Sequence, residues 1–142
     1  MFGRILKNST NAPLLMKSLD AAMLRQRVIA NNIANVNTPG YRRMEVSFEE
    51  QLREALKTGS VRGRRTHPDH MPTGRPKIQE VNAEAYHPVD PTLPSGVNNV
   101  DIDMEMAKLA ENQLMFNYGV RFAKGMYTKL NSAIQARSIP VG

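Results

Sequence analysis

Histidine is the side chain in this sequence best suited to binding a metal or moving a proton, and the chain has three. His67 and His70 flank Pro68 and Asp69 in one short run, and His87 lies further along. Pro68 prevents the helical geometry that would bring the two imidazoles of this run onto one side. No third ligand is anchored nearby, as a zinc site requires. The sequence therefore predicts no metal site.

No other group of residues has the pattern of a catalytic site. The chain has no cysteine and no glycine-flanked serine elbow, so no activated nucleophile is evident. The run 59–63, GSVRG, lacks the Lys-Ser/Thr ending of a phosphate-binding loop. The paired acids Glu49-Glu50 and Asp101/Asp103 occur where helices are expected to begin, and negative charge is favourable there. We expect a protein that is not an enzyme, with no cofactor and no small-molecule substrate.

A compact basic patch could support nucleic-acid binding. Arg62, Arg64 and Arg65 lie close together, with Arg75 and Lys77 further on. Such charge contacts phosphates, but the patch lacks interleaved aromatic residues and no nucleic-acid-binding module surrounds it. We expect no nucleic-acid partner. A nucleic-acid-binding protein or a cytoplasmic helical adaptor remains the alternative function.

Composition narrows the remaining classes. The 142 residues predict one domain, and seven basic residues against one acid in residues 1–43 account for the whole net charge of +6. A basic end binds an anionic partner or forms a solvated helix face. The absence of cysteine excludes disulfides. Lys17 and Asp20 interrupt the first apolar stretch, so we expect no cleaved secretory signal and no membrane span.

Two long helices are expected at the ends of the chain, paired through heptad-like seams. The first covers residues 13–35 and the second covers residues 103–135, with Asp101 or Asp103 as its cap. The first seam consists of Leu15, Leu19, Ala22, Gln26, Ile29, Ile33 and Val36. The second seam consists of Met106, Leu109, Gln113, Phe116, Val120, Ala123, Tyr127, Leu130 and Ile134.

The segment between the helices has a different character. Ser47 to Glu50 fits a capping box before a short helix that would end at Gly59. Six prolines in residues 59–99 favour an extended loop or short β pieces. We therefore predict a mainly α fold, with residues 1–36 and 101–142 as a discontinuous, coiled-coil-like helical domain. Residues 37–100 form an inserted turn, short helix and extended arm.

The first helix is expected to end in an asparagine-rich turn. Asparagine tolerates left-handed backbone and bonds nearby backbone groups, which suits a helix exit. Pro39 and Gly40 fit the two central positions of a type II turn, which predicts a positive φ at Gly40. The candidate interface residues in this stretch are Asn31, Asn32, Ile33, Asn35, Asn37, Pro39, Gly40 and Tyr41.

Two stretches carry a resemblance to a known family. Residues 30–43, ANNIANVNTPGYRR, resemble the N-terminal signature of bacterial flagellar rod, hook and hook-associated axial proteins. Residues 98–122, NNVDIDMEMAKLAENQLMFNYGVRF, resemble the C-terminal signature of the short basal-body rod proteins of that family. Met104 departs from the pattern, because a basic residue is expected there. Together the two matches cover about half of the chain.

The resemblance implies a structural subunit that polymerises into the proximal rod of the flagellar basal body, within the periplasmic space or cell envelope. It implies export by the flagellar type III apparatus without a cleaved signal, and terminal helices paired along the inner wall of the rod. The implied partners are other copies of the chain, other rod proteins, the basal-body ring adaptor protein and the export gate.

Two expectations follow for the helix pair. Gln26 and Gln113 each interrupt a seam, so in an antiparallel pair they would meet and fix the register. A lone pair of helices leaves seam residues uncovered, so residues 1–35 and 103–142 should be mobile in the monomer and become ordered on polymerisation.

Overall fold

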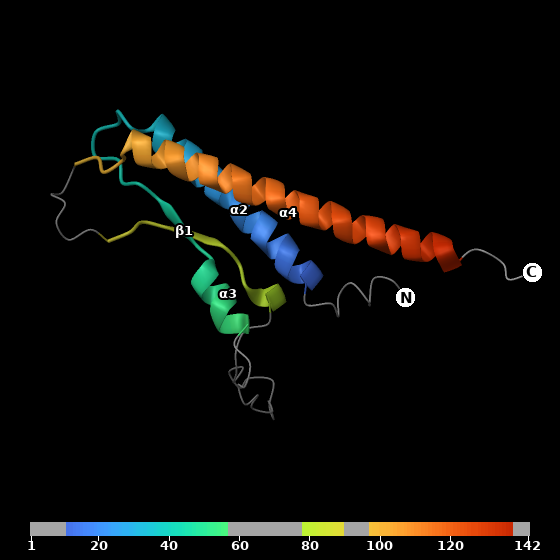
Figure 1. Cartoon of the computed structure of the whole chain (residues 1–142). Coiled ribbons are helices and arrows are strands. Elements are labelled where there is room, and N and C mark those ends of the chain that lie inside the picture. The colour runs from blue at the N-terminus through green and yellow to red at the C-terminus, as the bar shows by residue number, and fades with distance from the viewer. Residues whose placement is uncertain (1–10, 57–77, 90–96, 138–142) are drawn as a thin grey trace, which may run out of the picture.

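The computed structural model describes residues 11–56, 78–89 and 97–137, and it is mainly α-helical (Figure 1). Helix α2 (Asn11–Ala34) and helix α4 (Ile102–Arg137) come from opposite ends of the chain and pack against each other. Between them in sequence lie strand β1 (Glu45–Ser47), helix α3 (Glu49–Leu56), the short 3-10 helix η1 (Ile78–Glu80) and strand β2 (Glu84–Tyr86). The predicted fold class, a discontinuous helical pair with an insertion, is confirmed.

Helix α2 lies between α4 on one side and the inserted segment on the other. Strands β1 and β2 pair antiparallel, with Val46 opposite Ala85. A small core of Ala21, Phe48 and Val81 attaches the insertion to α2, and Leu52, Ala55 and Ala83 pack around it. The insertion therefore gives α2 a second buried face that a simple helix pair would lack.

Helix α4 begins where its capping residue predicts. The Asp101 carboxylate accepts hydrogen bonds from the backbone N–H groups of Asp103 at 2.9 Å and Met104 at 3.2 Å, as an N-cap should. The helix then runs for 36 residues, which is about 54 Å. Its last turns extend past Asn11, the first described residue of α2 (Figure 1).

The seam of α4 was predicted correctly on one of its two stripes. Leu109, Phe116, Ala123 and Leu130 are partly buried against α2, as expected. The other stripe lies one residue earlier than predicted and consists of Glu105, Asn112, Gly119 and Met126. The prediction was wrong there because it chose the neighbouring positions Met106, Gln113, Val120, Tyr127 and Ile134, all of which are exposed.

The seam of α2 agrees with the prediction except at its polar position and at Val36, which follows the end of the helix. Ala22 and Ile29 are buried, and Leu15, Leu19 and Ile33 are half-buried. Gln26 is exposed. Gln113 is also exposed, and its amide donates to Asn117 in the next turn of α4 at 3.4 Å. The hypothesis that these two glutamines meet inside the seam and set its register is therefore wrong.

The start of α3 also differs from the prediction. Ser47 is the last residue of β1, and the Phe48 carbonyl accepts the first helical hydrogen bond, from the Leu52 N–H at 2.9 Å. The helix thus begins at Glu49, because burial of Phe48 in the small core fixes the chain at that point. Gly59, the basic patch at residues 62–77 and the His67–His70 run lie outside the described residues.

Candidate assembly interface

The turn after α2 has the predicted geometry. Gly40 has a φ of 73°, and the Tyr41 N–H donates to the Thr38 carbonyl at 3.3 Å. Pro39 and Gly40 therefore occupy the two central positions of a type II turn. The turn reverses the chain at the end of the helix pair where α4 begins, which we call the tip (Figure 1).

Asn32 is the centre of a buried polar network at the tip. Its side chain is fully buried and makes four hydrogen bonds. Its Nδ2 donates to the Met44 carbonyl and to Glu105 Oε2, both at 2.9 Å. Its Oδ1 accepts from the Met44 N–H at 3.0 Å and from the Tyr41 hydroxyl at 3.1 Å. One amide thus fixes α2, the turn, the segment before β1 and α4 relative to one another.

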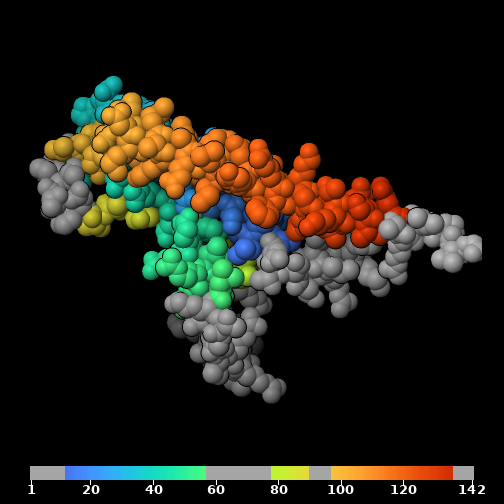
Figure 2. All heavy atoms as spheres, in the orientation of Figure 1, coloured from blue at the N-terminus to red at the C-terminus, as the bar shows by residue number. Residues whose placement is uncertain are grey.

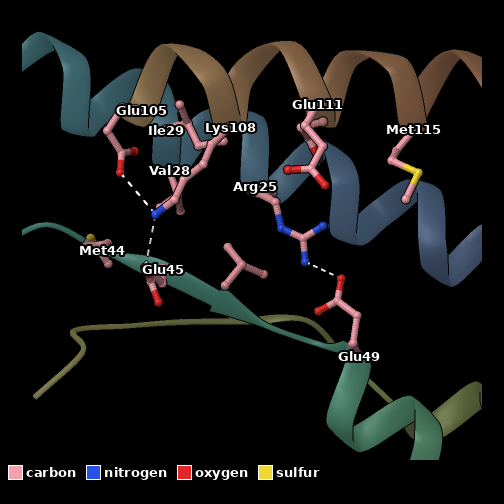
Figure 3. A pocket seen from close by; sticks show the side chains of 12 residues that line it. Arg25, Val28, Ile29, Met44, Glu45, Glu49, Glu105, Lys108, Glu111 and Met115 are labelled. Atoms are coloured by element: carbon pink, nitrogen blue, oxygen red, sulfur yellow. Dashed lines mark hydrogen bonds and ion pairs between the residues drawn. The ribbon is translucent and has the colours of Figure 1, made fainter. Parts of the chain in front are cut away.

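Ion pairs extend this network onto β1, and Figure 3 shows those made by Lys108. Lys108 lies 3.5 Å from Glu105 and donates to Glu45 at 3.2 Å. Arg43, which the figure does not draw, pairs with Glu45 at 3.1 Å. Desolvation raises the pKa of Glu45. The hydrogen bond from Lys108 and the charges of Arg43 and Lys108 outweigh that effect, so the pKa lies below its ordinary value.

Asparagines of the second signature complete the tip. The Asn98 amide donates to the carbonyls of Asn35 and Val36 at 2.8 Å and of Thr38 at 2.9 Å, which satisfies backbone acceptors at the end of α2. The Asn99 side chain accepts the Arg43 N–H at 2.8 Å. The two sequence signatures therefore bind each other within one subunit.

The remaining predicted residues of the turn have smaller roles. Asn35 bonds the Asn31 carbonyl at 2.8 Å, and Asn37 is exposed. Among the residues described, glycine alone has a positive φ, so the asparagines do not end the helix through left-handed backbone. They act through side-chain hydrogen bonds to the backbone instead. Ile33 belongs to the α2 seam, and Pro39 is exposed.

Sequence reasoning missed three positions that the structure buries between the helices. Glu105 is 1% exposed, and Asn112 is 3% exposed and donates to the Ala22 carbonyl at 2.9 Å. Gly119 allows a close approach, because a Cβ there would lie 2.8 Å from Leu19 Cδ2. A sequence pattern could have identified these positions. They are spaced seven residues apart, which is also the spacing between Leu109 and Phe116 of the apolar stripe.

The outer surface of α4 is rich in large apolar side chains. Met115 is 64% exposed, Tyr118 59% and Phe122 73%. The predicted interface residues Met106, Val120, Tyr127 and Ile134 are exposed on the same helix. Figure 2 shows that α4 forms one continuous ridge of the molecular surface. So much exposed apolar area on one helix indicates a surface that packs against another protein.

Metal sites and membrane-spanning helices can be assessed only in the part of the chain that the structure describes. No group of three or more acidic or histidine side chains there is arranged to hold a metal ion. The described helices are not apolar and long enough for any of them to cross a bilayer. His87 Nδ1 lies 3.2 Å from the Arg43 carbonyl, next to the tip network.

Comparisons with known proteins agree with this arrangement. A family model described as flagella basal body rod protein matches residues 15–42, which include most of α2 and the turn. The chain is 30% identical to the flagellar basal body rod protein FlgB of Bacillus subtilis over 135 residues, which cover 94% of this chain and 95% of the relative. It is 32% identical to the FlgB protein of Borrelia hermsii, covering 86% of this chain and 93% of the relative. The FlgB protein of Salmonella typhimurium is 30% identical, with 73% of this chain and 78% of that relative covered. The chain therefore belongs to the family of flagellar basal body rod proteins FlgB.

Proposed function

We propose that this chain is a structural subunit of the flagellar basal-body rod that assembles through its terminal helices and transmits torque. The observation that carries the proposal is the exposed apolar surface of α4 on a chain of the FlgB family. Proteins of that family are structural rod components, so the chain is not an enzyme. Exposed apolar side chains along one helix mark a surface that another protein covers.

The partners are other subunits of the basal body. Other copies of the chain and other rod proteins would cover the α4 surface, and the basal-body ring adaptor protein and the export gate would contact the chain at the base. The proximal part of the rod is the proposed position, within the periplasmic space. Export through the flagellar type III apparatus without a cleaved signal is the proposed route, and it agrees with Lys17 and Asp20 interrupting the first apolar stretch.

Fractionation of cells tests the proposal against its alternative. A tagged chain should co-purify with basal bodies, and cells that lack it should be non-motile. Recovery of the chain only in the soluble fraction would instead favour a cytoplasmic adaptor. Co-purification with RNA or DNA that is lost at high salt would favour nucleic-acid binding.

The order of the terminal helices in the monomer supplies a second test. The tip network should protect the end of α2 and residues 105–112 of α4, whereas the last turns of α4 extend past the described start of α2. We propose that amide protection in a dilute monomer decreases along α4 and becomes uniform on assembly. Strong protection along the whole of α4 in a proven monomer would contradict ordering on assembly.

A further inference from the structure

A groove lies between the start of α2 and the second half of α4. It has a volume of about 710 Å³, and the described residues that line it all belong to these two helices. Apolar side chains form most of its wall, and a basic residue lies near each end. We call it the α2–α4 groove, and its main lining residues are Leu14, Leu15, Arg121, Phe122, Met126 and Lys129.

The α2–α4 groove has a shape that suits a third helix. Phe122 is 73% exposed although it is the largest apolar side chain of the lining. A Cβ added at Gly125 would meet no atom within 4 Å, so the space beside this glycine is open. Arg121 and Lys129 are eight residues apart, which is about 12 Å or about two helical turns. An apolar depression of this length between two helices can accept the apolar face of a third helix.

The charged residues of the groove are both basic. Arg121 and Lys129 line it, and no acid lies among the described residues of the lining. Neither side chain forms an ion pair with a residue that the structure describes. Residues 116–137 contain four basic residues and no acid, so this half of α4 supplies no counter-charge. The groove therefore favours an occupant that brings carboxylates.

The chain itself offers no matching segment. Residues 1–10 contain two basic residues and no acid, and residues 11–34 contain three basic residues and one acid. The acidic helix α3 already packs on the small core through Leu52 and Ala55. The acidic first half of α4 packs on α2, where Glu105 bonds Asn32. These observations favour a different protein as the source of the occupant.

A lipid surface fits the groove less well than a helix does. Basic and apolar side chains on one helix face also bind anionic membranes, but such a face must project into the headgroup region. Here the apolar side chains line a depression between two helices. A helix can enter that depression, whereas a flat bilayer surface would contact only its rim.

We propose that the α2–α4 groove binds an acidic amphipathic helix of another protein in the basal body. The apolar face of that helix would lie against Leu15, Phe122 and Met126. Two of its carboxylates, about two turns apart, would pair with Arg121 and Lys129. The inference rests on the proposed function and specifies the chemistry of one partner. Because the occupant is a different protein, this contact does not by itself build a chain of identical copies.

A synthetic peptide tests the groove directly. The probe is a fluorescent peptide of about three heptads, with leucine at positions a and d and glutamate at positions e and g. Repulsion between its glutamates keeps the peptide from pairing with itself. Its matched control has lysine in place of every glutamate. We expect fluorescence anisotropy with the purified full-length chain to show saturable binding of the acidic peptide, with the lysine peptide bound at least about tenfold more weakly.

Charge reversal places the binding at this groove. Arg121→Glu and Lys129→Glu should each weaken binding of the acidic peptide by about tenfold, and the variant with both changes should prefer the lysine peptide. Lys124→Glu makes the same change of net charge at an exposed position outside the groove and should have little effect. Circular dichroism confirms that each variant is folded. No saturable binding of the acidic peptide, or an equal loss in the Lys124→Glu variant, would overturn the proposal.

Three further outcomes would assign the groove to another occupant and overturn the proposal. The first is sedimentation with vesicles of phosphatidylglycerol and phosphatidylcholine that is lost in the Arg121→Glu variant, which would indicate a lipid surface. The second is a dimer of the purified chain that Phe122→Ala dissociates, which would indicate a second copy. The third is an internal disulfide in the monomeric Ile5→Cys/Gly125→Cys variant, which would indicate the chain's own first residues.

The proposed function is tested separately from the groove. Recovery of the wild-type chain in basal bodies, together with failure of the acidic peptide to bind, would overturn this inference and leave the proposed function intact. Absence of the wild-type chain from basal bodies would contradict the proposed function, whatever the peptide does.

Discussion

The strongest test of the tip network is the isosteric change Asn32→Asp. The new carboxylate can still accept from the Met44 N–H and the Tyr41 hydroxyl. It cannot donate to the Met44 carbonyl or to Glu105, which both depend on Nδ2 in the natural chain. The substitution therefore preserves shape and removes two donors, in a site where Asn32 and Glu105 are 0% and 1% exposed.

The magnitude follows from these contacts. Two buried acceptors that lose their donor cost about 1–3 kcal/mol each. The new oxygen would lie about 2.9 Å from Glu105 Oε2, where two unit charges repel by about 6 kcal/mol at an effective dielectric constant of about 20. Protonation of one carboxyl limits that repulsion. A total of about 5 kcal/mol is comparable to the whole stability of a small domain.

Urea denaturation of the purified chain, followed by circular dichroism, measures this loss. Asn37→Asp is the matched control, because Asn37 belongs to the same asparagine-rich stretch but is exposed. We expect the control to change the unfolding free energy by less than about 0.5 kcal/mol. The destabilisation by Asn32→Asp should become smaller at acid pH, because protonation of one carboxyl removes the repulsion between the new side chain and Glu105. Equal stability of the two variants at neutral pH would refute the central role of Asn32.

Three further predictions follow from other positions. Gly40→Val should abolish motility with secretion largely retained, because φ is 73° there, whereas Gly40→Asn should keep most motility; normal motility of the valine strain would contradict this. Gly125→Ala should raise the unfolding free energy by about 1 kcal/mol, whereas Gly119→Ala should not, because the new Cβ would lie 2.8 Å from Leu19. An equal increase in unfolding free energy for both variants, measured by denaturation, would contradict the close approach. Glu45→Gln should destabilise the chain near neutral pH. The pKa of Glu45 in the folded state lies below its ordinary value of 4.5. The stability that its carboxylate contributes is therefore fully present above pH 4.5 and is lost as the pH falls through the folded-state pKa. A difference in unfolding free energy between the two proteins that stays constant across that pH range would contradict the ion pairs.

Apolar periodicity predicted those parts of the fold in which burial of apolar groups decides the structure. The α2 seam, the α4 stripe through Leu109 and Phe116, and the paired terminal helices are of this kind. The type II turn was equally predictable, because only a few residue types tolerate the backbone at Pro39 and Gly40.

The second stripe of α4 could not be predicted by the same rule. Glu105 and Asn112 are buried because particular partners on α2, Asn32 and the Ala22 carbonyl, satisfy them. Such bonds depend on the three-dimensional register and leave no trace in hydropathy. The apolar residues chosen in their place, including Met106 and Val120, remain exposed and available to partners. Glu105 and Asn112 could have been identified by their spacing. They are polar residues seven positions apart, and the neighbouring apolar stripe has the same spacing.

The interior and the exterior of the helix pair use opposite chemistry. Inside, the bonds of Asn32 to Glu105 and of Asn112 to Ala22 specify one antiparallel register, because a slip of either helix would leave buried polar groups without partners. Outside, α4 exposes Met104, Met106 and Met115, flexible side chains that fit surfaces of different shape. A subunit that must contact several different neighbours in one assembly needs a rigid frame and an adaptable surface. The asparagine-rich signature supplies the frame and α4 supplies the surface, so changes in the two should affect folding and assembly separately.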